Sequence, residues 1–504
     1  MLNGLTQPWS EAWSARANRT RTSVVSLTVT TATFLVIACA YVWFATAGTW
    51  HFRDTASAYF DALGASFLRG QLYLPDTVPA ALLALPNPYD PEQRKTVTPT
   101  WPWDSSLYHG HFYLYWGPAL AIVHAIWHLR FRSPLLESQF AVAIGLAICF
   151  VFWLLVWRLK HRAFAHAPEF LVWGSLLAFG LGGMLPYLIG RPSVYNSPIL
   201  LALLGLMSAL FCLAEAIAAT RRRRSLLCLA GIFLGWAIAS RITYVAYAMA
   251  IGLVVVWVLL RRRTNRGRAA GDLMAFTAPV VVAVLALLAY NWARFDSPFE
   301  FGQRYQLAGT DQTNAGLTCG SNLLGYVGLY FLSIPRLEAT YPFVPFSSGP
   351  ALPSPLKPPV LFPPLRLMLA ISQEPPIMSV FLMAPIGALT LSGLWLKRRL
   401  NVIASAGGVV LASLLGIAAT TGVLTCANGV DGRYFGDLAP TLSLAGTIVL
   451  LAWADQLAAV PSASNTLKAR RALYAFAMAA WGATVVVGVL LGTVAWLYWP
   501  ETMK

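Results

Sequence analysis

The sequence predicts an all-α polytopic membrane protein with about 11 transmembrane helices, juxtamembrane in-plane helices and two long external loops. Of the 504 residues, 57% are hydrophobic and only 11% are charged, and the mean hydropathy is +0.61. A soluble globular domain carries about 25% charged residues, so the chain has too much apolar surface for that class. The apolar residues form runs long enough to cross a bilayer, and basic residues cluster between these runs.

The distribution of positive charge sets the predicted orientation. The net charge is +16, but the lysines and arginines do not form one stripe of the kind that binds nucleic acid. They occur as short clusters at 16–21, 221–224, 261–268 and 397–399. Clusters of this kind hold helix ends on the cytoplasmic side by the positive-inside rule. We therefore expect membrane lipids as partners, no nucleic acid and a cytoplasmic N-terminus.

The predicted spans are those that keep these clusters on one side of the membrane. The first run, from Val24, follows the basic segment SARANRTRT and ends without a small-residue cleavage site, so we interpret it as a helix and not as a signal peptide. The runs 112–129 and 322–335 would carry basic clusters to the far side, and we interpret them as interfacial or re-entrant helices. The spans are 24–46, 137–157, 169–189, 197–219, 225–241, 243–260, 273–291, 377–395, 401–424, 436–454 and 472–497.

This topology places two long loops, 47–136 and 292–376, outside the membrane within a single domain, 1–504. Most acidic residues fall on this external side. Few charges lie inside the spans, and those such as Glu215 and Asp437 are near helix ends. An ion-coupled transporter keeps ionisable groups at the bilayer midplane, so the pattern disfavours that class. Function is therefore expected on the external face.

The first external segment, FRDTASAYFDALGASFLRG (52–70), is amphipathic. On a helix, Phe60 and Leu63 share one face, and Asp54 and Asp61 lie on the opposite face. We expect the helix to lie along the membrane surface. Asp54 then stands at headgroup depth, where a base is needed if a lipid phosphate meets a substrate from water. The alternative is a solvated anchor helix without a chemical role.

The order of these features resembles the GT-C superfamily of integral-membrane glycosyltransferases. The matching features are Asp54 just after the first helix, a juxtamembrane helix, and YLYWGPALAIVHAIWHL as a second in-plane helix. NWARFDSPFEFGQRY (291–305) and DGRYFGDLAPTLSLAG (431–446) look like segments of uncharacterised bacterial members of the branch with protein O-mannosyltransferases and aminoarabinose transferases. The resemblance covers most of the chain. It implies an inverting hexosyl or pentosyl transferase that uses a polyprenyl-phosphate sugar on the external face of a bacterial inner membrane.

The resemblance also implies which carboxylate is catalytic. Asp54 matches the family residue that accepts the proton of the acceptor hydroxyl. Asp104, between Trp103 and the second in-plane helix, is the second candidate. A turn-forming or capping aspartate is the alternative at that position.

Arginines at external helix ends are the candidates for binding the phosphate. A guanidinium group pairs with two phosphate oxygens at once, which suits Arg191, Arg241 and Arg433. Tyr195 and Tyr434 follow two of these arginines and can add hydrogen bonds. Snorkelling to lipid headgroups and an interfacial tyrosine belt are the alternatives.

No metal or cofactor is expected beside the donor lipid, which is a substrate. The metal-dependent oligosaccharyltransferase branch carries an acidic pair in the second external loop, where this sequence has GRPSVYNSP. His109 and His111 form a pair without a convincing third ligand. Cys319 and Cys426 are the only external cysteines, and in an oxidising periplasm they either form a disulfide or remain thiols.

Two other functions remain open at this point. A lipid-linked glycan flippase or transporter needs a polar path with ionisable groups at depth, of which the sequence shows little. A glycan polymerase or ligase shares the lipid-linked donor, so donor chemistry alone distinguishes it from the transferase. The sugar is open, and the acceptor is open among a glycan, a lipid and a protein.

Overall fold

The computed structural model describes residues 7–52, 58–97, 101–131, 133–219, 221–262, 265–314, 323–333, 379–394, 404–427, 431–459 and 464–497. Asp54 and Cys319, two residues of the predicted sites, lie outside these ranges. The described chain is mostly helical, and its only sheet is a two-stranded hairpin.

Nine helices of the described residues are long and apolar enough to cross a membrane, which confirms the predicted polytopic all-α class. Their most apolar stretches contain at most two charged residues, so a bilayer accommodates each of them as a span. The long helices are α1 (Gln7–Ala45), α6 (Glu137–Ala163), α9 (Ser197–Ala218), α10 (Arg223–Ser240), α11 (Val245–Arg261), α12 (Arg266–Phe295), α16 (Ala404–Ala427), α17 (Phe435–Ala458) and α18 (Ser464–Leu497).

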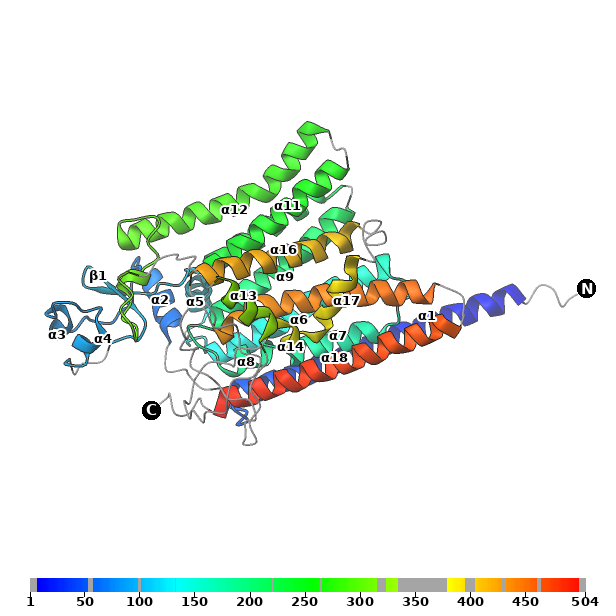
Figure 1. Ribbon diagram of the computed structural model, residues 1–504, viewed down its shortest axis with the longest axis horizontal. Coiled ribbons are helices and arrows are strands. Elements are labelled where there is room, and N and C mark those ends of the chain that lie inside the picture. Colours follow the sequence, from blue (N-terminus) through cyan, green and yellow to red (C-terminus); the bar gives the residue numbers. More distant parts are fainter. Residues whose placement is uncertain are drawn as a thin grey trace, which may run out of the picture.

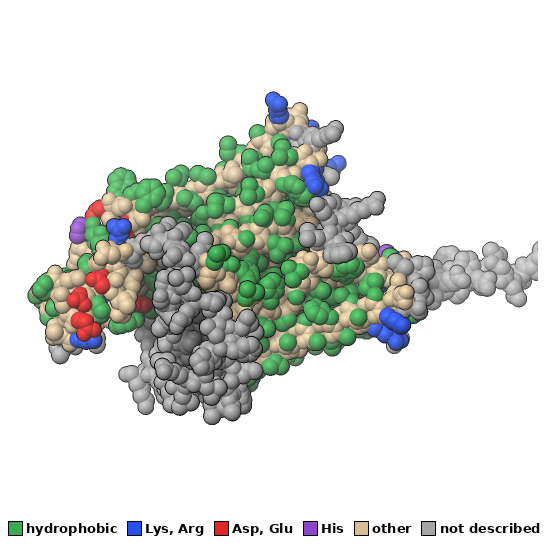
Figure 2. Space-filling view, in the orientation of Figure 1, with side chains coloured by type: hydrophobic (Ala, Val, Ile, Leu, Met, Phe, Trp, Pro, Cys, Tyr) green, Lys and Arg blue, Asp and Glu red, His purple; other side chains and the backbone are tan. Residues whose placement is uncertain are grey.

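The long helices run roughly side by side, with α12 at one edge of the bundle and α1 with α18 at the other (Figure 1). Every residue in the most apolar stretch of α17 is buried, whereas only 11% of the corresponding stretch of α12 is buried. The α17 helix is therefore the centre of the bundle, and α12 presents most of its surface outward. Figure 2 shows an apolar belt over the bundle, with Asp and Glu gathered at one end.

Two of the eleven predicted spans form broken segments. The run 169–189 becomes α7 (Phe170–Leu181) and α8 (Leu185–Gly190), interrupted at Gly183, whose positive φ of 58° ends the regular helix. The run 377–395 contains α14 (Val380–Met383) and a 3-10 segment, η3 (Pro385–Leu394). Pro385 disfavours helical geometry at Ala384, so α14 stops there.

The other elements are short and lie mainly at one end of the bundle. The two runs predicted not to cross coincide with helices well below spanning length: α5 begins within 112–129 and ends one residue beyond it, and α13 lies within 322–335. The short elements are α2 (Tyr59–Phe67), α3 (Ala80–Leu83), α4 (Pro91–Arg94), β1 (Ser106–Tyr108), β2 (His111–Tyr113), α5 (Ala119–Arg130), η1 (Ile242–Tyr244), η2 (Gln303–Tyr305), α13 (Leu323–Leu332) and η4 (Gly432–Tyr434).

The elements from α2 to α5 form a separate small core at that end of the bundle. Phe60, Leu63, Phe112 and Trp116 are buried in this core. The helices α2 and α5 touch closely because Gly64 has no side chain, and a Cβ there would lie 2.8 Å from the backbone nitrogen of Ala125. The helix α2 thus buries its apolar face on α5.

Polar contacts tie α2 to α5 and the first loop to the segment after α12. The carboxylate of Asp61 lies 3.1 Å from Nδ1 of His124 and 3.0 Å from Nε2 of His128. Ser106 of β1 forms a bridge with Gln306, and the Leu307 amide donates to the Ser105 carbonyl at 2.8 Å. Residues from the two long loops that the sequence analysis predicted to be external are therefore brought together at one place.

Candidate functional site

Four chain segments bring polar and aromatic side chains together at the end of the bundle. Asp104 comes just before β1, and Tyr195 stands two residues before α9. Arg241 lies between α10 and η1, and Arg433 lies in η4 just before α17. The segments are far apart in sequence, but the interactions below join them into one cluster.

Asp104 is the carboxylate of this cluster. Its backbone has a positive φ of 59°, a conformation that costs energy for a residue other than glycine and that clusters at functional sites. The hydroxyl of Tyr195 donates a hydrogen bond to its Oδ2. Burial raises the pKa of the Asp104 carboxyl above its ordinary value, while the hydrogen bonds of Tyr195 and Gln306 and the charge of Arg433 oppose that rise.

Arg433 connects Asp104 to the start of α17. Its guanidinium carbon lies 4.5 Å from the centre of the Tyr195 ring, in a cation–π contact. Its Nη2 pairs with Oδ2 of Asp431 at 2.9 Å, and Oδ1 of Asp431 accepts from the Arg433 amide at 3.0 Å. The turn DGR therefore fixes both the backbone and the side chain of this arginine.

Arg241 is fixed by a buried carboxylate. Its Nη2 donates to Oδ2 of Asp437 at 2.9 Å, and the Asp437 side chain is fully buried. Its guanidinium carbon lies 5.5 Å from the centre of the Tyr434 ring. Tyr247 supports the same turn of α17 by donating to the Asp437 carbonyl oxygen at 2.8 Å. The contacts with Asp437 and Tyr434 therefore fix the guanidinium group of Arg241, and 12% of its side chain stays exposed.

Tyr115 lies among these charged groups, although the sequence did not single it out. Burial raises the pKa of its hydroxyl far above the ordinary value, and the charges that act on it include Arg433, Asp104 and Arg241. Its ring stacks on Trp116 with the ring centres 3.9 Å apart. The signal that would have found it is YLYWG, a polar aromatic run directly before an apolar helix.

The structure brings together five of the predicted site residues, namely Asp104, Tyr195, Arg241, Arg433 and Tyr434. Another predicted site residue, Arg191, follows α8, and its Nη1 donates to the Tyr187 hydroxyl at 3.4 Å. Sequence reasoning missed Gln306, and it did not recognise Asp437 as the partner of Arg241. A buried acidic residue at a helix start needs a cationic partner. A search for the partner of Asp437 among the basic residues at helix ends would have found Arg241.

The two histidines weighed as a metal-binding pair, His109 and His111, stack on tyrosine rings. His111 stacks on Tyr73 with ring centres 3.9 Å apart, and His109 stacks on Tyr108 at 4.0 Å. Among the described residues, no group of three or more His, Cys, Asp or Glu side chains has the arrangement of a metal site.

Two predictions fall wholly or partly outside the described residues. Asp54 is one of them, so its role as the base stays a prediction. Cys426 is disulfide-bonded, but its predicted partner Cys319 is not described, so that pairing also stays a prediction.

No protein-family model and no curated protein matches this sequence. Among solved structures, the chain is similar to the Archaeoglobus fulgidus oligosaccharyltransferase in its apo form, with 12% identity and a TM-score of 0.44 over 93% of this chain and 56% of that chain. It is also similar to the archaeal oligosaccharyltransferase AglB from Archaeoglobus fulgidus in complex with an inhibitory peptide and a dolichol-phosphate, with 13% identity and a TM-score of 0.47 over 94% of this chain and 56% of that chain.

The chain spans a little over half the length of these oligosaccharyltransferases.

Proposed function

We propose that this protein is an inverting glycosyltransferase that moves a sugar from a polyprenyl-phosphate donor to an acceptor on the external face of a bacterial inner membrane. The observation that carries the proposal is a half-buried carboxylate, Asp104, in one cluster with two fixed arginines, Arg241 and Arg433. The cluster stands at the end of an apolar helix bundle, which is the level of lipid headgroups.

The chemistry assigns each group a task. The acceptor hydroxyl oxygen attacks the anomeric carbon of the sugar, and its proton passes to the Asp104 carboxylate. The bond between the anomeric carbon and the phosphate oxygen breaks, and the lipid phosphate leaves with its electron pair. Arg241 and Arg433 stabilise the charge that develops on this phosphate. One displacement of this kind inverts the anomeric configuration.

The cluster also suits this chemistry because its charged groups are held in place in advance. Asp431 and Asp437 hold the two arginines in place before any substrate arrives, so little reorganisation is needed as charge develops. Tyr115 and Tyr195 keep their hydroxyl protons at neutral pH, as an ordinary tyrosine does, and burial raises the pKa of both hydroxyls further. Trp116 packs edge-on against Tyr195 and supports its position, with ring centres 5.4 Å apart.

Asp54 remains the alternative base, since the family resemblance points to it. The remaining predicted partners belong to the same proposal: the donor lipid in the membrane, and a glycan, lipid or protein as acceptor. An N-terminus on the cytoplasmic side is supported by the charge pattern, because most Lys and Arg side chains visible in Figure 2 lie at the end of the bundle away from the Asp104 cluster.

The proposal is tested by following lipid phosphate release from a panel of polyprenyl-phosphate sugars, with the anomeric configuration of the product determined by NMR. We expect release with inversion for at least one donor. Arg433→Lys keeps the charge but loses the planar fork, and we expect its rate to fall about 100-fold. Arg304→Lys is the matched control, because Arg304 is 60% exposed and pairs only loosely with Glu300 at 4.0 Å.

Three results would overturn the proposal. Retention of the anomeric configuration contradicts a single displacement. Equal rates for Arg433→Lys, Arg304→Lys and the wild type remove the arginine cluster from the reaction. Transbilayer movement of the lipid without any release favours the flippase.

A further inference from the structure

The acceptor of the proposed reaction reaches Asp104 from one particular side. In a single displacement the acceptor hydroxyl attacks opposite the leaving group, so the acceptor and the phosphate lie on opposite sides of the sugar. Arg433 and Arg241 mark the phosphate side, and Tyr195 packs against Arg433 there. A further hydrogen bond to Asp104 comes from Gln306, in the segment after α12. The acceptor therefore approaches across the surface formed by that segment and the β1–β2 hairpin, which lie side by side at the end of the bundle (Figure 1).

Aromatic rings line this surface outward from Asp104. We use the name aromatic strip for Trp103, Tyr305, Tyr108, His109 and Asp296. The centre of the Tyr108 ring lies 4.6 Å from that of Tyr305 and 4.0 Å from that of His109. The Trp103 side chain is 54% exposed. Trp103 directly precedes Asp104, and Tyr305 directly precedes Gln306, so the strip begins at the carboxylate.

Strained backbone marks both ends of the aromatic strip. Asp104, His109 and Asp296 have positive φ angles of 59°, 47° and 54°. This conformation costs energy for residues other than glycine and clusters at functional sites. The Tyr108 hydroxyl donates to Oδ2 of Asp296 at 3.1 Å, and the Asp296 side chain is 70% exposed. The outer end of the strip therefore offers a fixed hydrogen-bond acceptor beside the rings.

We propose that the aromatic strip binds the acceptor of the reaction and that this acceptor is a neutral glycan with more than one sugar ring. The inference rests on the proposed function, since Asp104 as the base fixes where the reacting hydroxyl lies. The four residues from Asp104 to Tyr108 span at most about 14 Å, which is longer than one sugar ring. Sugar rings pack their C–H faces on aromatic side chains, and their hydroxyls donate to groups such as the Asp296 carboxylate.

The sheet edges argue against a peptide as the acceptor. An extended peptide binds by adding a strand to a free edge, where it pairs with backbone groups. This chain already occupies both edges of the hairpin. Beside β1, the Leu307 amide donates to the Ser105 carbonyl at 2.8 Å, and beside β2 the Leu74 amide donates to the Phe112 carbonyl at 2.8 Å. The surface therefore presents mainly side chains to its ligand.

Charge argues against an anionic acceptor. Asp and Glu side chains gather at this end of the molecule (Figure 2). Like charges placed against each other weaken association, so a phosphorylated glycan is disfavoured. An acceptor that binds through a hydrocarbon chain is disfavoured too, because it would cover the exposed Asp296 and His109 side chains without giving them hydrogen bonds.

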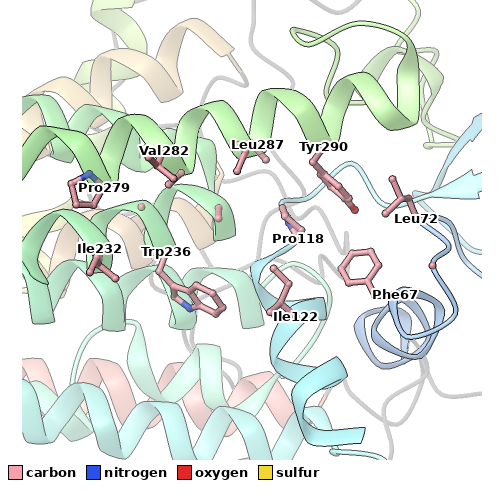
Figure 3. A pocket seen from close by; sticks show the side chains of 15 residues that line it. Phe67, Leu72, Pro118, Ile122, Ile232, Trp236, Pro279, Val282, Leu287 and Tyr290 are labelled. Carbon is pink, nitrogen blue, oxygen red and sulfur yellow. The ribbon is translucent and has the colours of Figure 1, made fainter. Parts of the chain in front are cut away.

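The apolar cavity of the molecule does not offer a glycan an alternative place. It has a volume of about 590 Å³ and lies between α10 and α12 on one side and α2 and α5 on the other (Figure 3). Only two of its lining side chains, Trp236 and Tyr290, carry a hydrogen-bonding group. A glycan buried there would leave most of its hydroxyls without partners, which is costly.

The test is calorimetric titration of the full-length protein, in phosphatidylcholine nanodiscs and without donor, with short neutral oligosaccharides built from hexoses or from pentoses. We expect at least one of them to bind with a dissociation constant of about 1 mM or lower. Trp103→Ala removes the ring beside Asp104 and should raise this constant at least about fivefold, as loss of an aromatic anchor does. Trp50→Ala is the matched control, because Trp50 is also 54% exposed but packs against Trp43 after α1. Its binding should stay within about twofold of the wild type.

Tyr305→Leu is a second variant that removes a ring from the strip, and no residue of η2 is buried, so the change leaves the core intact. It should weaken binding as Trp103→Ala does. Binding of no neutral oligosaccharide, or equal binding by the wild type and both strip variants, would overturn the proposal. Tighter binding of a phosphorylated form of the same oligosaccharide would contradict it as well.

The titration is independent of turnover, because it contains no donor. Absence of lipid-phosphate release from every donor refutes the proposed function. Release that persists while oligosaccharide binding is equal in the wild type and the strip variants refutes only the assignment of the aromatic strip.

Discussion

Removing the hydroxyl group of Tyr195 tests whether the ionisation of Asp104 controls activity. Tyr195→Phe keeps the ring that lies under Arg433 and deletes the hydrogen bond to the carboxylate. Burial raises the pKa of Asp104, and this hydrogen bond is the first of the interactions that oppose the rise. Without it, the carboxylate is less stable relative to the protonated form, so the variant needs a higher pH to become active.

The size of the effect follows from the strength of the lost bond. A hydrogen bond to a charged group contributes about 1.5–3 kcal/mol. Since one pH unit corresponds to about 1.4 kcal/mol, the acidic limb of the pH–rate profile should move up by about one to two pH units. In the wild type this limb already lies above pH 3.8, the ordinary value for an aspartate, because activity rises as the pH passes through the raised pKa of Asp104.

The assay is lipid-phosphate release measured as kcat/KM across the acidic range for the wild type, Tyr195→Phe and Tyr73→Phe. Tyr73 stacks on His111 in the same loop, so its variant controls for the loss of a loop tyrosine hydroxyl. The acidic limb of the pH–rate profile should lie at the same pH in the wild type and in Tyr73→Phe. An unmoved limb in Tyr195→Phe, or a limb moved to lower pH, would refute the role given to this hydrogen bond.

Two further predictions concern stability. Asp437→Asn leaves Arg241 buried without its counter-ion and should destabilise the protein by about 3–5 kcal/mol. The double change Arg241→Met with Asp437→Leu should recover thermal stability without recovering turnover. Equal midpoints of thermal unfolding for Asp437→Asn and the wild type would contradict this. Burial raises the pKa of Asp61, but the hydrogen bond from His124 and the charges of His128 and His124 outweigh it and lower the pKa. The stabilisation is therefore present above pH 3.8 and lost as the pH falls through the lowered value. Asp61→Asn should remove this dependence of stability on acid pH and should lower the free energy of unfolding by about 2 kcal/mol at neutral pH. Thermal unfolding at several pH values measures both effects.

Much of the architecture was predictable because a bilayer imposes a strong rule on sequence. A span needs about 20 apolar residues, and nine of the predicted spans appear as uninterrupted helices. The runs 169–189 and 377–395 satisfied the same hydropathy rule but form broken segments. Local backbone preferences at Gly183 and Pro385 decide this, and average hydropathy over a window does not report them.

The candidate site was predictable in its residue types and less so in its contacts. Arginine and tyrosine at the predicted external helix ends pointed to Arg191, Arg241, Arg433, Tyr195 and Tyr434. The structure brings the last four to the Asp104 cluster, whereas Arg191 donates to Tyr187 after α8. The pairing of Asp437 with Arg241 and the place of Gln306 beside Asp104 were not predicted, because they depend on which loops meet in space. Arg241 and Asp437 are 196 residues apart, and Asp104 and Gln306 are about 200 residues apart. Sequence alone does not show that residues so distant along the chain meet.

The most direct test of the account is the rate of lipid-phosphate release by Asp104→Asn compared with Asp54→Asn and the wild type, with the donor found in the panel. Asparagine keeps the size and polarity of aspartate but does not accept the proton. The account predicts that Asp104→Asn loses about two to four orders of magnitude in rate. Release by Asp104→Asn at the wild-type rate, with loss confined to Asp54→Asn, would contradict it and place the base outside this cluster.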